Sequence, residues 1–302
     1  AIDANQGTPH GLMIGEIKGV PHPILIELYG LGDKVYPLRT RQALFNGIPG
    51  LIERYPSYAA FANVDQTTLL ESIDLQGAYL LQVNTLDTGL MINDGKGQFT
   101  FTPLTEICQL APSFGALLHD IDGDGHQDIL IGQNASSKSP ELGPSTAGIS
   151  TLLKGTGSGR FELVAPHQTG LQIFEETRSL ARISLSETNG QGLLFGINRR
   201  APKAYQSIRS GHWLSIDLRG KPGNLRAVGS RVWLELESGL KHSFEIQSKS
   251  GYATQSSHRI LIGLGQANSL TATLNIRWPT GKQSQHQLIN QAAGTMSLSE
   301  PD

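Results

Sequence analysis

The sequence predicts a mainly β protein: partial β-propeller blades with a small helical insertion, followed by a β-sandwich-like C-terminal domain. Glycine is abundant, at 35 of 302 residues, while only 17% of the residues are charged, a mix typical of all-β folds with many tight turns. Short apolar runs bounded by glycine recur through the first two thirds of the chain, and alternating apolar and polar residues dominate the last third. We place the domain boundary where this pattern changes, between 1–209 and 210–302.

An acidic loop at residues 120–128 is the most informative motif. Carboxylates occupy its positions 1, 3, 5 and 9, and a glycine occupies position 6. Ca²⁺ takes about six to eight oxygen ligands, and this spacing supplies most of them from one short segment. The loop therefore predicts one structural Ca²⁺ site. Its expected ligands are the carboxylates of Asp120, Asp122, Asp124 and Asp128 and the backbone carbonyl of His126. The alternative is a solvated acidic turn, in which four close carboxylates would repel one another.

The residues on either side of the acidic loop predict strands. Residues 114–119 and 129–132 are short, branched, apolar runs beside glycine, which is typical of strands. An EF-hand needs two flanking helices and a Glu at position 12, where this chain has Ile131. We therefore expect a strand–loop–strand cation site.

An internal repeat surrounds the acidic loop. Residues 90–99 align with residues 152–161, and both segments carry a Gly-x-Gly turn that predicts a β-hairpin. Residues 129–134 are echoed by residues 193–198 at a similar offset. Four-stranded units that repeat in this way predict propeller blades. The second copy lacks the carboxylates, so we expect a single cation site. Its corresponding positions are Ser184, Ser186, Thr188 and Gly192.

Residues 37–72 predict a small helical insertion in a blade connection. The segments 42–45, 51–55 and 67–71 have helical spacing of apolar residues, interrupted by proline and glycine. Asp65 is a predicted N-cap, because an aspartate there accepts a hydrogen bond from the first helical turn. The insertion either packs on the surface without a further role, caps one face of the propeller, or contacts a partner.

Residues 211–300 predict an antiparallel sheet folded into a sandwich or barrel. Alternation with period 2 marks five strands, at 213–218, 230–236, 243–246, 259–262 and 274–278. Trp213, Trp233 and Trp278 lie on these strands, and we expect them in the core rather than as sugar-binding platforms.

Two sets of motifs resemble known families. Phe114-Gly115-Ala116 and the 120–128 loop resemble FG-GAP (VCBS-type) repeats, which occur in integrin α-chain propellers and bacterial surface proteins. This resemblance implies propeller blades and an extracytoplasmic location: periplasmic, on the cell surface or secreted. The three or four blade-like units are fewer than a full propeller has. Either the chain is a fragment, or the N-terminal segment and the C-terminal domain cover the open strand edges.

The C-terminal region resembles an ASPIC/UnbV domain, and the combination with FG-GAP repeats resembles the cartilage acidic protein family in a bacterial member. Five ordered motifs carry this resemblance: His212-Trp213-Leu214, Asn224-x-Arg226-Ala227-x-Gly229-x-Arg231-Val232, Gly251-Tyr252-x-x-Gln255-Ser256, Gly263-Leu264-Gly265 and Trp278-Pro279-Thr280-Gly281.

Polar residues within these motifs form a candidate ligand site. They are Asn224, Arg226, Arg231, Tyr252 and Gln255. Arginine forks and tyrosine rings can recognise a carboxylate, a sugar or a peptide. The alternative is that these side chains tie loops to the sandwich by hydrogen bonds.

Several classes of function are disfavoured. The net charge is −2, without the basic face that a nucleic-acid binder needs, and no apolar run is long enough to span a membrane. Cys108 is the single cysteine, so no intramolecular disulfide can form. Zinc-protease, nucleophile-elbow and phosphate-loop motifs are absent, so no catalytic residue and no organic cofactor is predicted. The chain starts at Ala1 without a signal peptide, which we interpret as processing or truncation.

Two local patterns have ordinary explanations. Asn134-Ala135-Ser136 fits the glycosylation acceptor pattern, a weak signal in a bacterial protein. The Glu175-Glu176 doublet is expected to be a solvated turn.

The leading functional hypothesis is a non-enzymatic, extracytoplasmic binding or adhesion module, braced by calcium and specific for an unidentified protein or glycan. The alternative is a propeller enzyme, a hydrolase or lyase that acts on a polysaccharide or secondary metabolite, because propellers host many active sites. A third possibility is a scaffold in which the helical insertion docks a neighbouring chain.

Overall fold

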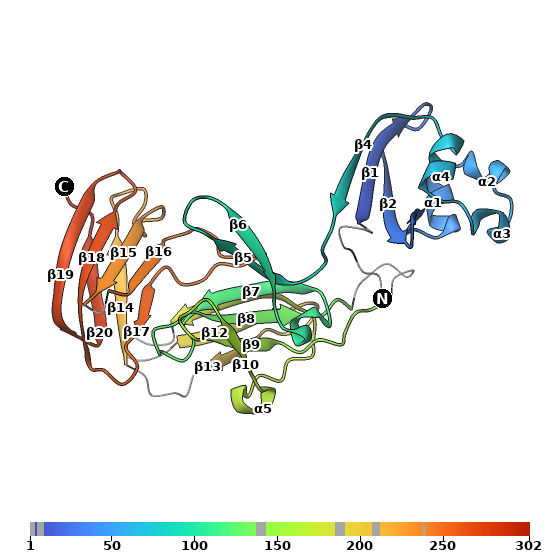
Figure 1. The fold of residues 1–302 in the computed structure, drawn as a ribbon. Coiled ribbons are helices and arrows are strands. Elements are labelled where there is room, and N and C mark those ends of the chain that lie inside the picture. Colours follow the sequence, from blue (N-terminus) through green and yellow to red (C-terminus); the bar gives the residue numbers. More distant parts are fainter. Residues whose placement is uncertain (1–3, 5–8, 137–142, 185–190, 207–211, 238) are drawn as a thin grey trace. The chain divides into compact units, whose positions relative to one another are not determined.

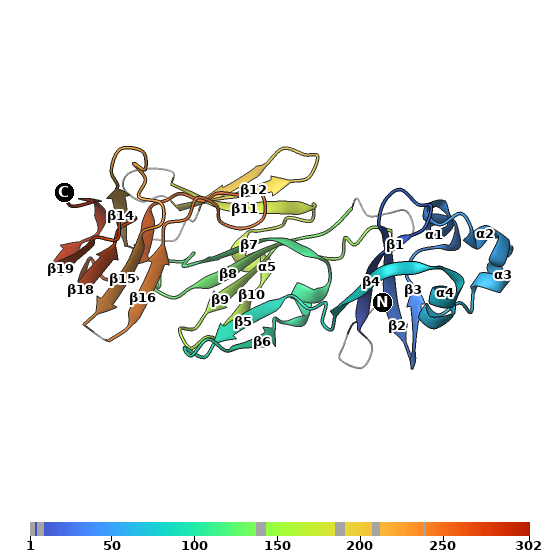
Figure 2. The same ribbon diagram turned by 90° about the horizontal axis from the view of Figure 1, so that it is seen from above.

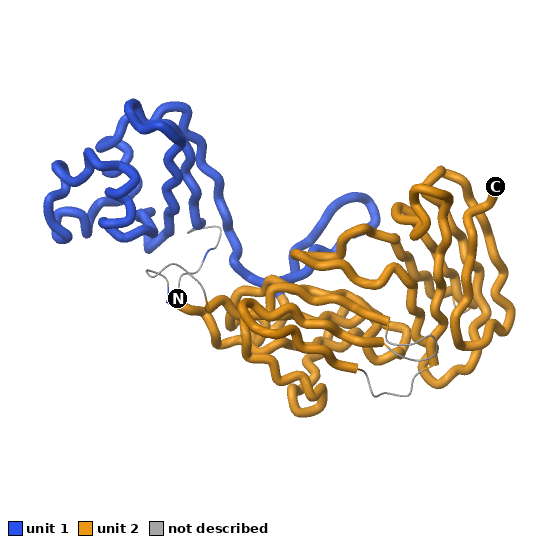
Figure 3. The backbone as a smooth tube through the Cα atoms, turned by 180° about the vertical axis from the view of Figure 1, so that it is seen from behind, with its two compact units in different colours: residues 1–103, 138–143 blue, residues 104–137, 144–302 orange. Residues whose placement is uncertain are grey.

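The computed structural model describes residues 4, 9–136, 143–184, 191–206, 212–237 and 239–302. The chain divides into two compact units, residues 1–103 with 138–143 and residues 104–137 with 144–302 (Figure 3). The expected domain boundary between 209 and 210 lies outside the described residues, within the span of the second unit.

The first unit contains an antiparallel sheet of order β3-β2-β1-β4 and four short helices (Figure 1). Ile24, Ile26 and Leu28 alternate along β2 and share one core with helical residues such as Leu69. The strands are β1 (His10–Ile17), β2 (Ile24–Leu31), β3 (Lys34–Pro37), β4 (Leu75–Val83) and a separate hairpin of β5 (Gly89–Asn93) and β6 (Phe99–Pro103). The helices are α1 (Arg41–Gly47), α2 (Leu51–Arg54), α3 (Tyr58–Phe61) and α4 (Gln66–Ser72). They confirm the helical segment predicted at 37–72.

The second unit begins with two antiparallel meanders. The first has the order β10-β9-β8-β7 and the second the order β11-β12-β13. Their elements are η1 (Glu106–Gln109), β7 (Ser113–His119), β8 (Asp128–Gln133), β9 (Thr151–Gly155), β10 (Phe161–Val164), α5 (Pro166–Thr169), β11 (Thr177–Ser184), β12 (Gln191–Ile197) and β13 (Lys203–Gln206). Strand β11 packs against β7 and β8 (Figure 2). Leu130, Leu180 and Phe195 lie in the core that the two sheets share.

The up-and-down order of these meanders is the order expected of propeller blades, and the hairpins predicted at 90–99 and 152–161 are present as β5–β6 and β9–β10. None of the sheets formed by the described residues closes on itself, so the propeller stays a prediction. Ser186 and Thr188, from the second copy of the acidic loop, lie outside the described residues.

The C-terminal region consists of two sheets on one core. One sheet has the order β17-β14-β20 and the other the order β16-β15-β18-β19, and Leu214, Val232 and Leu274 are fully buried between them. The strands are β14 (Trp213–Arg219), β15 (Arg231–Leu236), β16 (Lys241–Glu245), β17 (Ile260–Gly263), β18 (Ser269–Arg277), β19 (Gln283–Ala292) and β20 (Gly294–Ser299). This arrangement agrees with the expected two-layer β fold.

Two details of the C-terminal region differ from expectation. Strand β14 pairs in parallel with β20, whereas an antiparallel sheet was predicted. The chain crosses from one sheet to the other between β19 and β20, so the antiparallel constraint of a hairpin does not apply. Trp278 is buried as predicted, but Trp233 lies on an outer face of its sheet and is 43% exposed.

Candidate metal centre

The acidic loop connects β7 to β8, which confirms the strand–loop–strand arrangement. The strands pair up to His119 and Asp128, so residues 120–127 must turn back within a few positions. Gly123 and Gly125 have φ values of 80° and 91°, a region that side chains other than glycine rarely adopt. These two glycines let the loop fold its carboxylates inward.

Asp120 and Asp128 hold the loop in shape. Both residues are buried, at 4% and 2% exposure. Asp120 accepts hydrogen bonds from the backbone N–H groups of Gly123, at 2.7 Å, and Gly125, at 2.9 Å. Asp128 accepts from Ile121 N at 2.8 Å and from Gly155 N, on strand β9, at 2.9 Å. The two carboxylates therefore anchor both ends of the loop.

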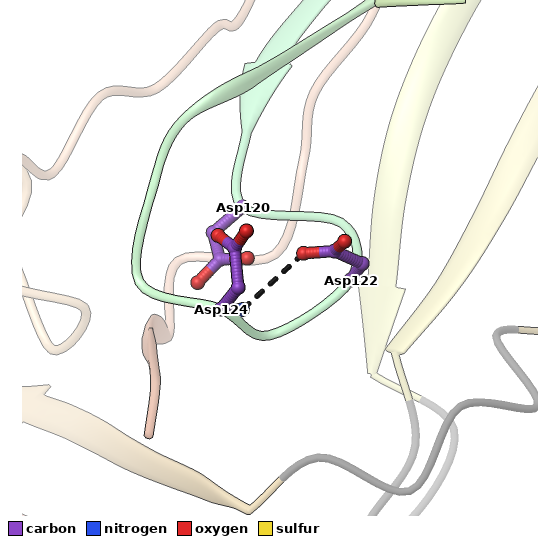
Figure 4. A group of neighbouring side chains, drawn as sticks. All are labelled: Asp120, Asp122 and Asp124. Atoms are coloured by element: carbon purple, nitrogen blue, oxygen red, sulfur yellow. Dashed lines mark hydrogen bonds between the residues drawn. The ribbon is translucent and has the colours of Figure 1, made fainter. Parts of the chain in front are cut away.

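Asp120, Asp122 and Asp124 converge on one point. Each offers a carboxylate oxygen, and these oxygens lie within 4.8 Å of one another (Figure 4). Asp122 also accepts a hydrogen bond from the backbone N–H of Asp124 at 3.3 Å. Three convergent carboxylates are a suitable donor set for a hard cation, which prefers oxygen ligands. The residues present therefore fit the predicted Ca²⁺ site in this part of the loop.

Lys154 on strand β9 places a positive charge beside this cluster. Its ammonium forms an ion pair with Asp122 and lies 2.7 Å from Asp124 Oδ2. Hydrogen bonds to Asp122 and Asp124 raise the pKa of Lys154 above its ordinary value. Lys154 therefore neutralises part of the loop's negative charge, a role that its sequence position did not indicate.

The carboxyl groups of the loop titrate differently because their surroundings differ. Burial raises the pKa of Asp120 to about 6, against the hydrogen bonds from Gly125 and Gly123. Burial also raises the pKa of Asp128. At Asp124 burial acts to raise the pKa, but Lys154 outweighs it and the pKa is lowered. Buried carboxylates of this kind are stabilised in their charged form when a cation lies nearby.

The other two predicted ligands, Asp128 and His126, do not belong to the group of three converging carboxylates. The two oxygens of Asp128 accept hydrogen bonds from the backbone N–H groups of Ile121 and Gly155. The backbone N–H of His126 donates to Asp124 at 2.9 Å. Its imidazole lies against Gly157 in the β9–β10 turn, where a Cβ would overlap the ring.

The C-terminal region packs directly on the acidic loop. Gly265 N donates to the carbonyl of Gly123 at 2.7 Å. The Trp213 ring covers Gly123, where an added Cβ would lie 2.9 Å from the ring. An added Cβ on Gly263 would overlap the Asp120 carboxylate and lie 2.5 Å from the Gly123 carbonyl carbon. The Gly263-Leu264-Gly265 motif therefore allows its own backbone to lie close to the backbone of the acidic loop. The motif was visible in the sequence, but the segment that it contacts was not.

The five candidate ligand residues separate into two groups. Arg226 and Gln255 line a cavity of about 970 Å³ in the second unit. Asn224 instead ties its own loop, bonding Val228 O at 2.8 Å and Val228 N at 3.0 Å. Arg231 lies on β15, 4.0 Å from Glu245, and Tyr252 is exposed near Phe114. The structure thus brings together two of the five and adds Arg182, which the sequence did not single out.

Asn134 and Glu176 are more buried than their patterns predict. Asn134 is 1% exposed, and its amide bonds the backbone N–H and carbonyl of Gly148, so it is not an accessible glycosylation acceptor. Glu176 is 4% exposed, accepts from Ser136 N at 2.9 Å and forms an ion pair with Arg178. It is therefore not part of a solvated turn.

Residues 220–302 match the protein-family model described as ASPIC and UnbV. The chain is thus a mainly β protein that carries an ASPIC/UnbV domain at its C-terminal end. No curated protein matches the chain. A crystal structure of the major pilin subunit of Bacillus cereus is 8% identical, with a TM-score of 0.16 over 99% of this chain and 95% of that chain, a likeness too weak to carry an argument. Within the described residues, no helix has the length and apolar character needed to cross a membrane.

Proposed function

We propose that the chain is a calcium-braced, extracytoplasmic binding or adhesion module with FG-GAP-type blades, and that it is not an enzyme. The observation that carries this proposal is the convergence of Asp120, Asp122 and Asp124 in a strand–loop–strand segment. The single described cluster of this kind supports one structural ion rather than a set of sensor sites. The ligand is an unidentified protein or glycan.

The brace would act at the contact between the acidic loop and the C-terminal region. Asp120 already bonds Gly123, whose carbonyl accepts from Gly265. When bound, Ca²⁺ would supply positive charge to the three carboxylates and reduce their mutual repulsion. A bound ion would thereby hold the acidic loop in one conformation. Trp213 and Gly263 would then pack against a rigid surface.

The test is thermal unfolding with calcium and with chelator. A cation that binds only the folded state adds about 2.7 kcal/mol at a hundredfold excess over its Kd. We expect a higher melting temperature in calcium for the natural protein and no shift for Asp122→Ala. Asp87→Ala, a change at an exposed aspartate outside the loop, is the matched control and should keep the shift. A natural protein that melts identically in both conditions would remove the basis for the brace.

A second candidate function is a hydrolase or lyase that acts on a polysaccharide or secondary metabolite. One observation favours it: a cavity of about 630 Å³ beside the acidic loop, lined by Asp122, Glu162 and His167 among others. Paired carboxylates in a cleft are what glycoside hydrolysis needs. Release of reducing ends from a panel of polysaccharides, abolished in Glu162→Gln, would support the enzyme over the binding module.

A further inference from the structure

A second cavity, separate from the acidic loop, lies within the second unit. Its volume is about 970 Å³, within the range of about 300–1,000 Å³ typical of small-ligand sites. Five segments line it: the end of β11, the end of β14, the turn around Arg226, the segment 255–259 and the end of β20. Hydrogen bonds join these segments, since Arg182 N donates to Ser256 Oγ at 3.1 Å.

The charge of the lining is strongly unbalanced. Among the described residues, four arginines line the cavity, against one carboxylate, Asp217. The arginines are Arg182, Arg219, Arg226 and Arg259. None of the four forms an ion pair with another described residue, whereas Arg39 and Arg178 elsewhere in the chain do. Burial and the neighbouring Arg226 lower the pKa of His258, so that histidine adds no positive charge at neutral pH.

Arg182 differs from the other three arginines in being buried. It is 8% exposed, and its Nη2 donates to the carbonyls of Ser257, at 2.9 Å, and Arg259, at 2.6 Å. Its Nη1 has no hydrogen-bond partner among the described residues. Burial lowers the pKa of Arg182 to about 10, so it stays charged at neutral pH. A buried charge without a counter-ion is costly, and an anion at the cavity would supply that counter-ion.

We propose that this cavity binds a hydroxylated carboxylate ligand, namely the uronate units of an acidic oligosaccharide. Arginine forks recognise planar carboxylates by paired hydrogen bonds. Asp217, Ser257 and Gln255 lie among the arginines and supply acceptors and donors for sugar hydroxyls. That mixture suits a sugar acid better than a bare inorganic anion, which offers no hydroxyl donor to Asp217.

Uronate binding would give the proposed binding function its ligand class, and it depends on that proposed function for no other step. It needs no metal, because no residue of the acidic loop lines this cavity. The two proposals can therefore fail separately: calcium stabilisation is measured without sugar, and sugar binding is measured without calcium.

The experiment is calorimetric titration of the full chain with a galacturonate trimer in chelator, because uronates bind calcium themselves. We expect saturable binding of the trimer, none of the neutral galactose trimer, and weaker binding at high salt. Equal binding of both trimers, or none of either, would overturn the assignment. Inorganic sulfate binding as tightly as the galacturonate trimer would also overturn it, because the hydroxyl contacts would then contribute nothing.

Variants at exposed arginines keep the test independent of folding. Arg219→Gln and Arg226→Gln remove charges from exposed side chains, and each should weaken binding of the galacturonate trimer about tenfold. Arg277→Gln removes an exposed arginine that does not line the cavity and should leave the affinity unchanged. The proposal is wrong if Arg219→Gln and Arg226→Gln bind the trimer as tightly as Arg277→Gln does.

Discussion

At the residue scale, the carboxylates of the acidic loop differ in their burial and in the groups that they contact. Asp120 and Asp128 are buried and accept backbone hydrogen bonds that shape the loop, while Asp122 and Asp124 face the Lys154 ammonium. The spacing of the aspartates and glycines was enough to predict that this segment forms a turning loop. It could not predict Lys154, because that residue reaches the loop from the neighbouring strand β9.

We expect Lys154 to compete with a cation bound at the acidic loop. Replacing it in Lys154→Met removes a positive charge from Asp122 and Asp124, so calcium should bind about tenfold more tightly, which corresponds to about 1.4 kcal/mol. Calcium titration calorimetry measures this directly. Lys203→Met, which breaks an ion pair with Glu175, is the control and should leave calcium affinity unaltered. Weaker calcium binding in Lys154→Met would show that the lysine supports the site rather than opposing it.

We expect Glu176 to make the stability of the protein depend on pH. Burial acts to raise its pKa, but hydrogen bonds from Ser136 and Asn198 and the Arg178 guanidinium outweigh it and lower the pKa from 4.5 to about 2. A lowered carboxyl pKa contributes stability above the unfolded value of 4.5, and this contribution is lost as the pH falls from about 5 to about 2. The shift corresponds to at most about 3 kcal/mol.

The pH prediction is checked by urea unfolding at a series of pH values. The variant Glu176→Gln should be less stable than the natural protein at pH 7 and should lose less stability between pH 5 and pH 3. Parallel stability curves for the two proteins would mean that Glu176 contributes no pH dependence. The burial of Glu176 could not be predicted from the sequence, because an acidic doublet is ordinarily exposed.

At the scale of elements, the acidic loop is held between strands of different sheets. It leaves β7, enters β8, bonds β9 through Gly155 and contacts the end of β17 through Gly263. Apolar runs and alternation were enough to predict most of these strands, and Asp65 was correctly predicted as the cap of α4. Strands β19 and β20 were not predicted, because β19 in particular is rich in polar residues and half exposed.

Gly263→Ala tests the contact between the loop and β17. The added methyl group would overlap Asp120 and the Gly123 backbone, and overpacking of this kind costs about 1–3 kcal/mol. Urea unfolding followed by circular dichroism gives the change in the free energy of unfolding. Gly47→Ala, where an added Cβ meets nothing within 4 Å, should cost nothing. Equal stability of the two variants would argue against the close approach.

At the scale of the whole molecule, the chain forms two compact units, and each contains its own buried core. Composition and pattern predicted a mainly β protein with a helical segment and a two-layer C-terminal region. They did not predict how many sheets would associate, because closure of a propeller depends on contacts between distant blades rather than on local pattern.

The three tryptophans allow the second unit to be observed selectively. Trp213, Trp233 and Trp278 are the only tryptophans of the chain, and all lie in that unit. Calcium at a hundredfold excess over Kd should raise the melting transition seen by tryptophan fluorescence by about 5–10 °C relative to chelator. A calcium effect seen by circular dichroism but absent from tryptophan fluorescence would place the cation outside the second unit.

The most direct measurement of the central claim is a calcium titration of chelator-treated protein by calorimetry. The predicted result is saturable binding at about one ion per chain, lost in Asp122→Ala and retained in Asp87→Ala. No binding to the natural protein, or equal binding to Asp122→Ala, would contradict the assignment of the acidic loop as a calcium site.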